Sequence, residues 1–516
     1  MRILWFCLLP GMLSAGGPSQ TALNAITPEA VRSIVAYLAA DSLKGRNTPS
    51  PELDRCAEFL AERFRAYGLQ PVNGSYFQSV PIHRIHLGDS NRVTLRGQDG
   101  VEKTLAIKKD FVPFEITADR EVRGDIVFVG YGISAPEFDY DDYAGIDVAG
   151  KIVLALKGGP NEQKPDSPFS SQKRSPAVTL KEKVKCAMDH GAVGFMLVTN
   201  PLRSSLLKPT GFPWPSLSKS FPADALPVAL GKTEGQKMPC IQIGEEPIRT
   251  LFGSVEACKA LAQRIDSLGQ PHSQTLAHQA VLRTSVTTEI QYARNVVAQL
   301  PGSQDGANKD WLVVGAHYDH VGIRQNTPAG QDSIHNGADD NASGTAAMMM
   351  LAAAFSQEKN RPKRSVLFMA FAGEERGFFG SKTYVADPLV PLEHTVAMIN
   401  LDMVGRNRVD SLTVFGRHNA PELWAVVEKE NRHIGFKLSA GSVKDSGGSD
   451  HMPFNEQKIP TLFFHTGLHA DYHQVSDQAE KINYGKLTLA AKLAYRTVHR
   501  LADSDIRPVL HDTHIP

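Results

Sequence analysis

Side chains that could bind a metal ion stand at the ends of apolar runs in the second half of the sequence. In GAHYDH, His317 follows the run WLVVGA, and Asp319 would face the same side of a strand because it lies two residues further on. Four further motifs supply acids or a histidine: NGADDNASG with Asp339 and Asp340, FAGEERG with Glu374 and Glu375, INLDMVG with Asp402, and DYHQVSD with His473. Two histidines with several carboxylates suit zinc or a similar divalent ion.

Each motif taken alone has an ordinary structural explanation. Two acids before a helix commonly cap it, and a Glu-Glu pair is usually a solvated turn. Asp402 is harder to explain in this way, because an unpaired carboxylate inside the apolar NLDMV is costly to bury. The coincidence of all the motifs at the strand ends of one predicted sheet therefore indicates a metal site.

A site of this composition could hydrolyse an amide bond. Two divalent ions about 3.5–4 Å apart polarise a carbonyl, generate hydroxide and stabilise the tetrahedral oxyanion. One carboxylate must bridge the ions, and another must stay off the metal, take a proton from water and return it to the leaving amine. Glu374 and Glu375 can divide metal binding and proton transfer between them, because adjacent side chains point in different directions.

The segments around these motifs alternate between strand and helix. Strands are predicted at 295–300, 311–319, 364–375, 395–405, 411–416 and 461–466, and helices are predicted at 343–357 and 486–501. This alternation predicts an α/β fold with a central mixed, mostly parallel sheet and helices on both faces. In such sheets the chemistry gathers at the carboxyl ends of the strands, which is where the motifs fall.

Two other regions precede this one. Residues 26–80 are predicted to be helical, and the second helix there ends at Gly68. The first helix has an apolar face made of Val31, Ile34, Val35 and Leu38. From about 85 to 280, short apolar runs bounded by glycine predict a separate β-rich module. Its proline-rich part, 201–230, predicts an irregular exposed loop in which Trp214 either contacts a ligand or packs locally.

Composition limits the classes of function. The chain has 516 residues, and at roughly 150 residues per domain that length suggests about three domains. Its 42% hydrophobic content is ample for a sizeable core. Lys+Arg and Asp+Glu are both 55, so the net charge is zero, which argues against a general nucleic-acid binder. A zero sum can still hide a local cluster of one sign.

The N-terminus MRILWFCLLPGMLSAGG has one arginine, an apolar run and small residues, which predicts a signal peptide at residues 1–16 and export to a periplasm or the outside. A buried N-terminal element is the alternative. The run is too short to cross a membrane, so no span is expected in the mature chain. The four later cysteines form no CxxC pair: Cys56, Cys186, Cys240 and Cys258. Cys240 and Cys258 could pair, and simple buried thiols are the alternative.

The motifs GAHYDHVG, NGADDNASGTAA, AGEERGFFGS, NLDMVG and DYHQVSD, in that order, resemble those of metallopeptidase family twenty-eight. This co-catalytic di-zinc family includes bacterial leucyl aminopeptidases, aminopeptidase Y and glutamate carboxypeptidase II. The resemblance covers about 285–500 and extends to DSLKGRNT, whereas FVGYGI, YDDYAGIDVAGKIVL and HGAVGFMLV resemble a protease-associated domain. It implies a three-layer α/β/α zinc-peptidase domain of residues 26–84 and 285–505, with a β-rich protease-associated insert at 85–284.

The resemblance also implies a role for each matching residue. The five metal ligands would be His317 and Asp402 on one ion, Glu375 and His473 on the other, and Asp340 as the bridge. Glu374 would be the general base and then the acid, acting on a hydroxide that bridges the ions. Asp319 would support His317, and Asp339 would be a loop or cap residue. His451 and Tyr472 could contact substrate. Three further histidines, to which no role is assigned, are His320, His465 and His469.

The implied protein is an exported aminopeptidase that uses two divalent ions, with Zn²⁺ the expected metal, and acts on peptides or proteins with a free N-terminus. A carboxypeptidase or dipeptidase is the first alternative, and it would need a cation to clamp the substrate carboxylate; the candidates are Arg324, Arg376 and Arg406. Glutaminyl cyclisation is a second alternative. A binding or receptor protein that keeps the fold without catalysis is a third.

Overall fold

The computed structural model describes residues 17–173, 175–209, 211, 213–217, 226–231, 234–304, 309–324, 327–441 and 448–511. The predicted signal peptide at 1–16 lies outside these residues. The chain divides into two compact units, one of Met1–Pro81 with Tyr292–Pro516 and the other of Ile82–Gln291. The boundaries lie close to the predicted 84/85 and 284/285. That the second unit is a protease-associated domain stays a prediction.

A nine-stranded mixed sheet organises the first unit, although β10 and parts of β1 and β13 fall within the residue range of the second unit. In chain order its strands are β1 (Phe77–Leu87), β10 (Val228–Leu230), β13 (Val286–Leu300), β14 (Trp311–His317), β17 (Ser365–Phe371), β18 (Thr395–Leu401), β19 (Ser411–Phe415), β20 (Lys437–Ser439) and β21 (Thr461–His465). Their order across the sheet is β10-β1-β13-β17-β14-β18-β21-β19-β20. The pairs β17·β14, β14·β18 and β18·β21 are parallel, and β13·β17 and β21·β19 are antiparallel.

Strands β14, β17 and β18 lie in the middle of this sheet, and their sequences are mostly apolar. All seven residues of each strand are buried. A continuous apolar run is typical of a parallel strand that is covered on both faces, whereas a strand with one wet face alternates. The prediction of an α/β fold with a mixed sheet is confirmed.

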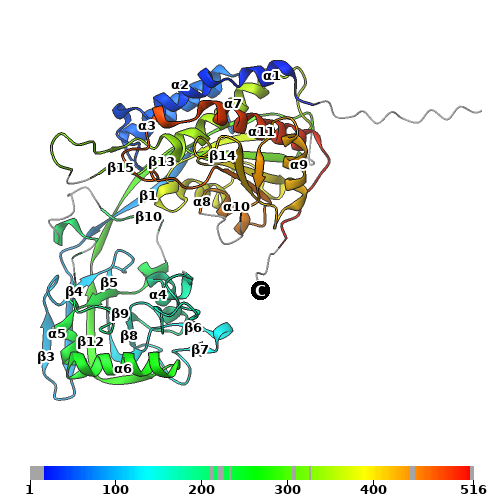
Figure 1. Ribbon diagram of the computed structural model, residues 1–516. Helices are drawn as coiled ribbons and strands as arrows, with labels where there is room; N and C mark the ends of the chain where they lie inside the picture. Colours follow the sequence, from blue (N-terminus) through cyan, green and yellow to red (C-terminus); the bar gives the residue numbers. More distant parts are fainter. Residues whose placement is uncertain are drawn as a thin grey trace, which may run out of the picture. The chain divides into compact units, whose positions relative to one another are not determined.

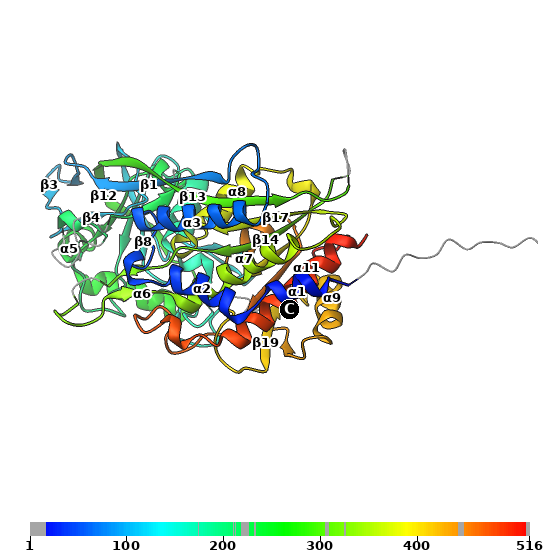
Figure 2. The ribbon, with the colours of Figure 1, turned by 90° about the horizontal axis from the view of Figure 1, so that it is seen from above.

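Helices cover both faces of the sheet. One face carries α1 (Gln20–Ala25), α2 (Pro28–Leu38), α3 (Pro51–Ala66), α7 (Gly344–Phe355) and α11 (Tyr484–Asp503). The other carries α8 (Phe379–Ala386) and α10 (His451–Glu456), as Figure 1 shows. Helix α7 is wholly buried, because it packs on β14, β17 and β18 and is itself covered by the other helices of its face, which lie in front in Figure 2.

Helices α2 and α3 have ordinary helix-start signals. Thr27 and Ser50 cap α2 and α3 with their hydroxyls, and a proline occupies the first turn of each helix. The predicted apolar face of α2 is buried, and α3 ends just before Gly68, whose φ is +75°. The helical prediction for 26–80 is wrong at its end, because β1 begins at Phe77.

The second unit holds an eight-stranded sheet. Its strands are β2 (Arg92–Gly97), β3 (Glu102–Leu105), β4 (Phe111–Pro113), β5 (Arg120–Val129), β8 (Ile152–Leu156), β9 (Gly194–Val198), β11 (Cys240–Ile243) and β12 (Ser273–Thr284). They lie in the order β3-β2-β12-β5-β8-β9-β11-β4. The helices of this unit are α4 (Leu180–Asp189), α5 (Glu245–Phe252) and α6 (Val255–Leu268).

The prediction of an exposed loop at 201–230 is wrong for Leu207 and Trp214, whereas Leu206 is exposed. Leu207 is buried, and Trp214 is fully buried and donates its indole N–H to the carbonyl of Pro113 at 2.6 Å. Trp214 therefore packs locally, since a buried indole with a satisfied N–H is an ordinary core residue. The four described cysteines are free thiols, so Cys240 and Cys258 do not pair.

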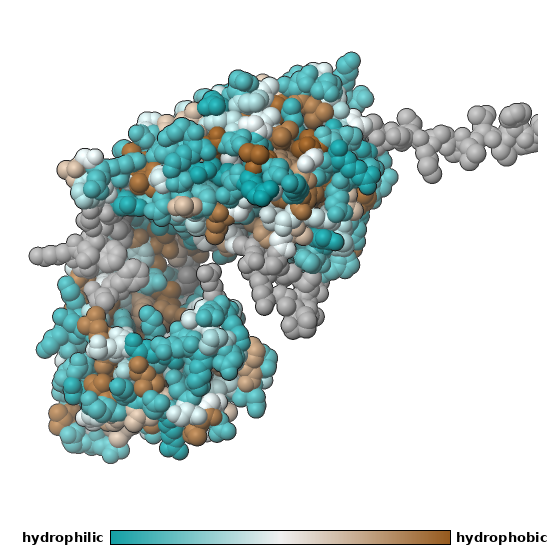
Figure 3. Space-filling model, viewed as in Figure 1, coloured by the Kyte–Doolittle hydropathy of each residue, from teal (hydrophilic) through white to brown (hydrophobic). Residues whose placement is uncertain are grey.

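Hydrophilic side chains cover most of the face in Figure 3, with hydrophobic ones scattered among them. The long apolar runs of the sequence are buried in the two sheets, which leaves mainly hydrophilic side chains on this surface. Among the described residues, no helix is both long enough and apolar enough to cross a membrane.

Candidate metal centre

The predicted metal ligands leave the carboxyl ends of neighbouring strands. His317 is the last residue of β14, Asp402 follows β18 directly, and Glu374 and Glu375 form the short turn that follows β17. Asp340 lies in the segment Ala338–Ser343, just before α7. Parallel strands end at the same edge of a sheet, so these side chains converge although they are far apart in the sequence.

One group of possible ligand atoms gathers around His473, which lies in the loop after β21. Its Nε2 is 3.0 Å from Asp340 Oδ2 and 3.1 Å from Glu375 Oε2. His320 joins this group, with its Nδ1 2.8 Å from Glu375 Oε1 and 3.8 Å from Asp340 Oδ2. The group thus offers two carboxylates and two imidazoles within 4.8 Å of one another.

A second group gathers around His317. Its Nε2 lies 3.4 Å from Asp402 Oδ1, 3.3 Å from Asp340 Oδ1 and 4.0 Å from Glu374 Oε2. The hydroxyl of Ser449 donates to the other oxygen of Asp402 at 2.8 Å. Asp402 Oδ1 has no hydrogen-bond partner among the described residues, and it points at the imidazole of His317.

Asp340 stands between the two groups and gives one carboxylate oxygen to each. Oδ1 faces His317 and Oδ2 faces His473. Burial raises the pKa of Asp340, but hydrogen bonds from His317 and His473 outweigh it and hold that pKa well below the usual range. An ionised carboxylate that presents its two oxygens to two groups of ligands has the geometry of a bridge.

Electrostatics at the site favour a cation. Burial lowers the pKa of His473, but its hydrogen bonds to Asp340 and Glu375 outweigh burial and raise that pKa to about 10. Burial also lowers the pKa of His317. The charges of Asp402 and Glu374 outweigh burial and raise that pKa well above its usual range. The carboxylates therefore hold protons on both imidazoles. Divalent ions would take the place of these protons, because imidazoles bind metals in the neutral form.

The donor set and its spacing fit zinc. Zinc bonds to nitrogen and oxygen are about 2.0–2.2 Å long, so two ligands of a tetrahedral ion lie about 3.3 Å apart. The distances from Asp340 and Asp402 to the imidazoles, 3.0–3.4 Å, are close to that value. The buried Asp402 Oδ1 without a hydrogen bond fits a ligand atom as well. That each of these residues binds an ion stays a prediction.

Glu374 lies beside the second group but is held differently. Its backbone N–H donates to Asp319 Oδ1 at 3.1 Å, and its carboxylate approaches His317 only to 4.0 Å. Burial raises the pKa of Glu374 well above its usual range, His317 offsets part of this, and the charges of Asp402 and Asp450 add to it. A raised pKa is what a carboxyl group needs to act as a general base and acid.

Asp319 supports both the histidine and the glutamate. Its Oδ1 is 3.6 Å from His317 Nδ1, and its Oδ2 accepts a hydrogen bond from the hydroxyl of Thr48 at 2.8 Å. Thr48 belongs to the N-terminal segment DSLKGRNT, so that segment contributes to the site directly. This contact gives a physical reason for a motif that the sequence marks only by resemblance.

Arg46, in the same segment, anchors the loops that carry the ligands. Its side chain is fully buried and donates to five backbone carbonyls. Its acceptors are the carbonyls of Leu38, Tyr318, Asn336, Gly337 and Asp340. Two of these acceptors flank or belong to predicted ligands, so a single guanidinium fixes the backbone after β14 and the backbone before α7.

We expect Arg46→Leu to lower the free energy of unfolding by at least about 3 kcal/mol, because it strips several buried carbonyls of their donor at about 1–3 kcal/mol each. Denaturant titration followed by circular dichroism would measure the loss. Arg55→Leu is the control, since Arg55 is exposed and, among the described residues, donates to a single carbonyl, that of Ser42. Equal stability of the two variants would contradict an anchoring role.

The other residues marked in the sequence fall around this centre. His451 is buried and stacks on Phe463 at 4.6 Å, and burial lowers its pKa to about 4, so it is neutral at pH 7. Tyr472 is partly exposed and stacks on His473 at 3.9 Å. Asp339 is buried and accepts the backbone N–H of Gly405 at 2.7 Å.

The remaining imidazoles and arginines have partners of their own. His465 Nδ1 is 2.8 Å from the carbonyl oxygen of Asp402, and His469 Nε2 is 3.2 Å from Asp339 Oδ2. Each of the three arginines near the motifs has a polar partner: Arg324 donates to Gln474, Arg376 to Asn47 and Arg406 to Asp471.

The sequence analysis assigned no role to three residues that contact the predicted ligands. His320 is named above without a role, yet it contacts Glu375. Asp477 accepts the backbone N–H groups of Asp339 and Asp340, and Ser449 orients Asp402. The sequence signals were an acid four residues after His473 and a serine in GGSDH, and neither pattern is specific by itself.

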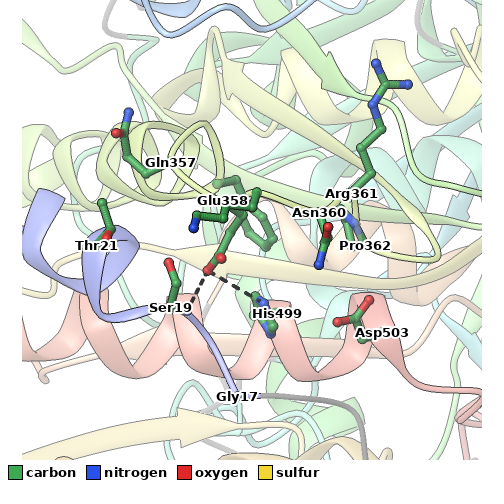
Figure 4. A pocket seen from close by; sticks show the side chains of 12 residues that line it. Gly17, Ser19, Thr21, Gln357, Glu358, Asn360, Arg361, Pro362, His499 and Asp503 are labelled. Carbon is green, nitrogen blue, oxygen red and sulfur yellow. Dashed lines mark hydrogen bonds and ion pairs between the residues drawn. The ribbon is translucent and has the colours of Figure 1, made fainter. Parts of the chain in front are cut away.

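The first unit also has a cavity of about 320 Å³, which Figure 4 shows, and it lies among other residues. Glu358 is at its centre and accepts the backbone N–H of Ser19 at 2.9 Å. None of the predicted ligands lines this cavity. The metal centre and the cavity are therefore separate features of the unit.

The chain is similar to known peptidases. The sequence model of peptidase family M28 matches residues 295–498. Aminopeptidase YwaD of Bacillus subtilis (strain 168) is 29% identical over 248 residues, which is 45% of this chain and 50% of that protein. A probable zinc metalloprotease of Pyrenophora teres f. teres (strain 0-1) is 38% identical over 118 residues, 23% of this chain and 24% of that protein. The chain thus spans half or less of the length of these curated relatives.

Among solved structures, an aminopeptidase from Aneurinibacillus sp. strain AM-1 has a similar fold. The match has a TM-score of 0.53 at 20% identity and covers 96% of this chain and 97% of that one. The predicted ligands from His317 to His473 all lie within the part that matches the family model. Residues 295–498 of this chain form a domain of peptidase family M28.

Proposed function

We propose that this chain is an exported zinc-dependent exopeptidase, an aminopeptidase that releases N-terminal residues from peptides with the help of two ions. The observation that carries the proposal is the position of Asp340, whose two oxygens face His317 and His473 in separate groups of ligands. A carboxylate between two such groups is what a two-ion site needs. The names of the similar aminopeptidases and zinc metalloprotease support the same conclusion.

The residues of the chain divide the work of hydrolysis. Two zinc ions, when bound, polarise the scissile carbonyl and make water more acidic. The two groups of ligands would hold these ions side by side. Glu374, which stands off His317 by 4.0 Å, would take a proton from the attacking water and return it to the leaving amine. Asp319 accepts the backbone N–H of Glu374 and faces the ring of His317. It would therefore fix the position of the general base relative to the metal ligand.

An aminopeptidase is favoured over a carboxypeptidase because each arginine near the motifs already donates a hydrogen bond to a side chain of this chain. A carboxypeptidase needs a cation to clamp the terminal carboxylate of its substrate. Arg406 is 2.7 Å from Asp471, and Arg376 is 2.5 Å from Asn47. A free α-amine needs the opposite, a carboxylate near the ions, and Glu374, Glu375 and Asp402 supply several.

Export rests on the leader-like sequence of residues 1–16 and is proposed on that ground alone. The free thiols of the described cysteines carry no weight here, since buried thiols occur in exported and internal proteins alike.

A panel of peptide substrates tests the proposal. We expect the purified protein to hydrolyse peptides with a free N-terminus, to spare N-acetylated ones and to ignore whether the C-terminus is amidated. Activity should disappear with a zinc chelator and return with added zinc. Cleavage of N-blocked but not C-blocked peptides would instead establish a carboxypeptidase, and pyroglutamate from an N-terminal glutamine would establish a cyclase. A folded protein with neither metal nor activity would favour the binding role.

A further inference from the structure

His320 contacts the metal centre in a way that none of the predicted roles explains. It lies three residues after His317, is fully buried, and directs its Nδ1 at Glu375 Oε1 at 2.8 Å. That distance is short for two ligands of one tetrahedral ion, which lie about 3.3 Å apart, and it is ordinary for a hydrogen bond. Its Nδ1 is 3.8 Å from the other nearby carboxylate, Asp340. Hence His320 bonds to one oxygen of one ligand.

The two oxygens of Glu375 consequently have different partners. Oε1 faces His320, whereas Oε2 is 3.1 Å from His473 Nε2. Together with Asp340 Oδ2, which is 3.0 Å from the same nitrogen, Oε2 completes a compact set of three ligand atoms. Burial and the charge of Asp340 raise the pKa of Glu375, but the interactions with His320 and His473 outweigh both and lower that pKa below its usual value.

The surroundings hold the ring of His320 in this orientation. A Cβ on Gly337 would lie 2.5 Å from the ring carbons, so the ring fits only because that residue is glycine. The edge of the ring meets His473 at a centroid distance of 5.6 Å, and the backbone N–H of His320 donates to the carbonyl of Arg46. His320 Nε2 has no hydrogen-bond partner among the described residues. The side-chain hydrogen bond of this ring is therefore the one between Nδ1 and Glu375.

We propose that His320 is a positioning residue for Glu375: its Nδ1–H fixes Oε1 and thereby presents Oε2, with Asp340 Oδ2 and His473 Nε2, to one of the two ions. This inference rests on the proposed two-ion function. A hydrogen bond of this kind orients a ligand carboxylate and lowers the cost of ordering it when the ion binds. Loss of such a partner typically weakens metal binding by about 10–100-fold.

Two substitutions separate the hydrogen bond from the volume of the ring. In His320→Asn the amide nitrogen falls near the position of Nδ1 and can still donate to Glu375. In His320→Gln the side chain fills a similar volume, but its amide lies near the position of Nε2. We expect the glutamine variant to bind one of the two zinc ions about 10–100-fold more weakly, and the asparagine variant to remain close to the unsubstituted protein.

The measurement is zinc affinity, by titrating metal-free protein with zinc in competition with a chromophoric chelator. Circular dichroism of each metal-free variant confirms that it is folded. Equal affinities in the glutamine variant and the unsubstituted protein would overturn the role of His320. Equal losses in the asparagine and glutamine variants would also overturn it, because a donor at Nδ1 would then be immaterial. An unsubstituted protein that binds no zinc, or one ion only, would overturn the proposed function first.

Discussion

The Glu374→Ala variant should lose hydrolysis of aminoacyl amides while its zinc content stays near that of the unsubstituted protein. A positioned general base typically contributes about 10²–10⁴-fold to the rate, and we expect a loss of that size in kcat. Zinc content should survive because Glu374 approaches His317 only to 4.0 Å, whereas Asp340 and Asp402 lie at 3.3 and 3.4 Å. Elemental analysis and kinetics on the same preparation measure both quantities.

Glu393→Ala is the matched control for this experiment, because Glu393 is an exposed glutamate of the same unit outside the metal centre. It should leave both zinc content and kcat unchanged. Full activity of Glu374→Ala would remove Glu374 from the mechanism. Loss of one zinc ion along with activity would make Glu374 a ligand and would leave the base unassigned.

The position of this glutamate in the fold could be predicted from the sequence because it depends on local patterns. Continuous apolar runs predicted β14, β17 and β18, and the acids and histidine that end these runs had to lie at one edge of a parallel sheet. The same reasoning placed Asp402, whose position after an apolar strand was costly without a partner. These inferences needed no knowledge of distant contacts.

The parts that could not be predicted depend on contacts between distant segments. Four of the five carbonyls that Arg46 bonds to lie 272–294 residues further along the chain, and Thr48 bonds to Asp319 over 271 residues. A single sequence contains no signal for such pairs beyond the residue types themselves. The direction of the His320 side chain could not be predicted either, because His320 lies beyond the end of β14, where side chains no longer alternate between the two faces of the sheet. Its direction is set by the room beside Gly337.

The order of strands in the second unit could not be predicted from the sequence either. Its pattern of short apolar runs predicted a β-rich module but not that β12 would lie between β2 and β5. The sequence leaves two alternatives for Trp214, and it cannot decide between them because the indole N–H donates to the carbonyl of Pro113, a contact over 101 residues. Proline restricts the backbone locally and says nothing about what the neighbouring side chains pack against.

Asp340→Asn should release both zinc ions and abolish activity, which makes it the substitution with the largest expected effect on metal binding. The amide keeps the shape of the side chain but carries no charge, and its nitrogen is a donor that must face one of the two groups. His317 and His473 would each lose an anionic partner at 3.3 and 3.0 Å. Since loss of a partner outside the ligand set costs about 10–100-fold in affinity, loss of a shared ligand should cost more than about 100-fold at each ion.

Asp402→Asn distinguishes a bridging carboxylate from an ordinary ligand. Asp402 faces His317 at 3.4 Å and belongs to one group only, so its substitution should weaken one ion and spare the other. Zinc titration of the two metal-free variants measures the difference directly, with two ions weakened in Asp340→Asn and one in Asp402→Asn. Weakening of a single ion in both variants would show that Asp340 does not bridge. The two-ion mechanism would then lack its central ligand, because no other described carboxylate faces both His317 and His473 within 3.5 Å.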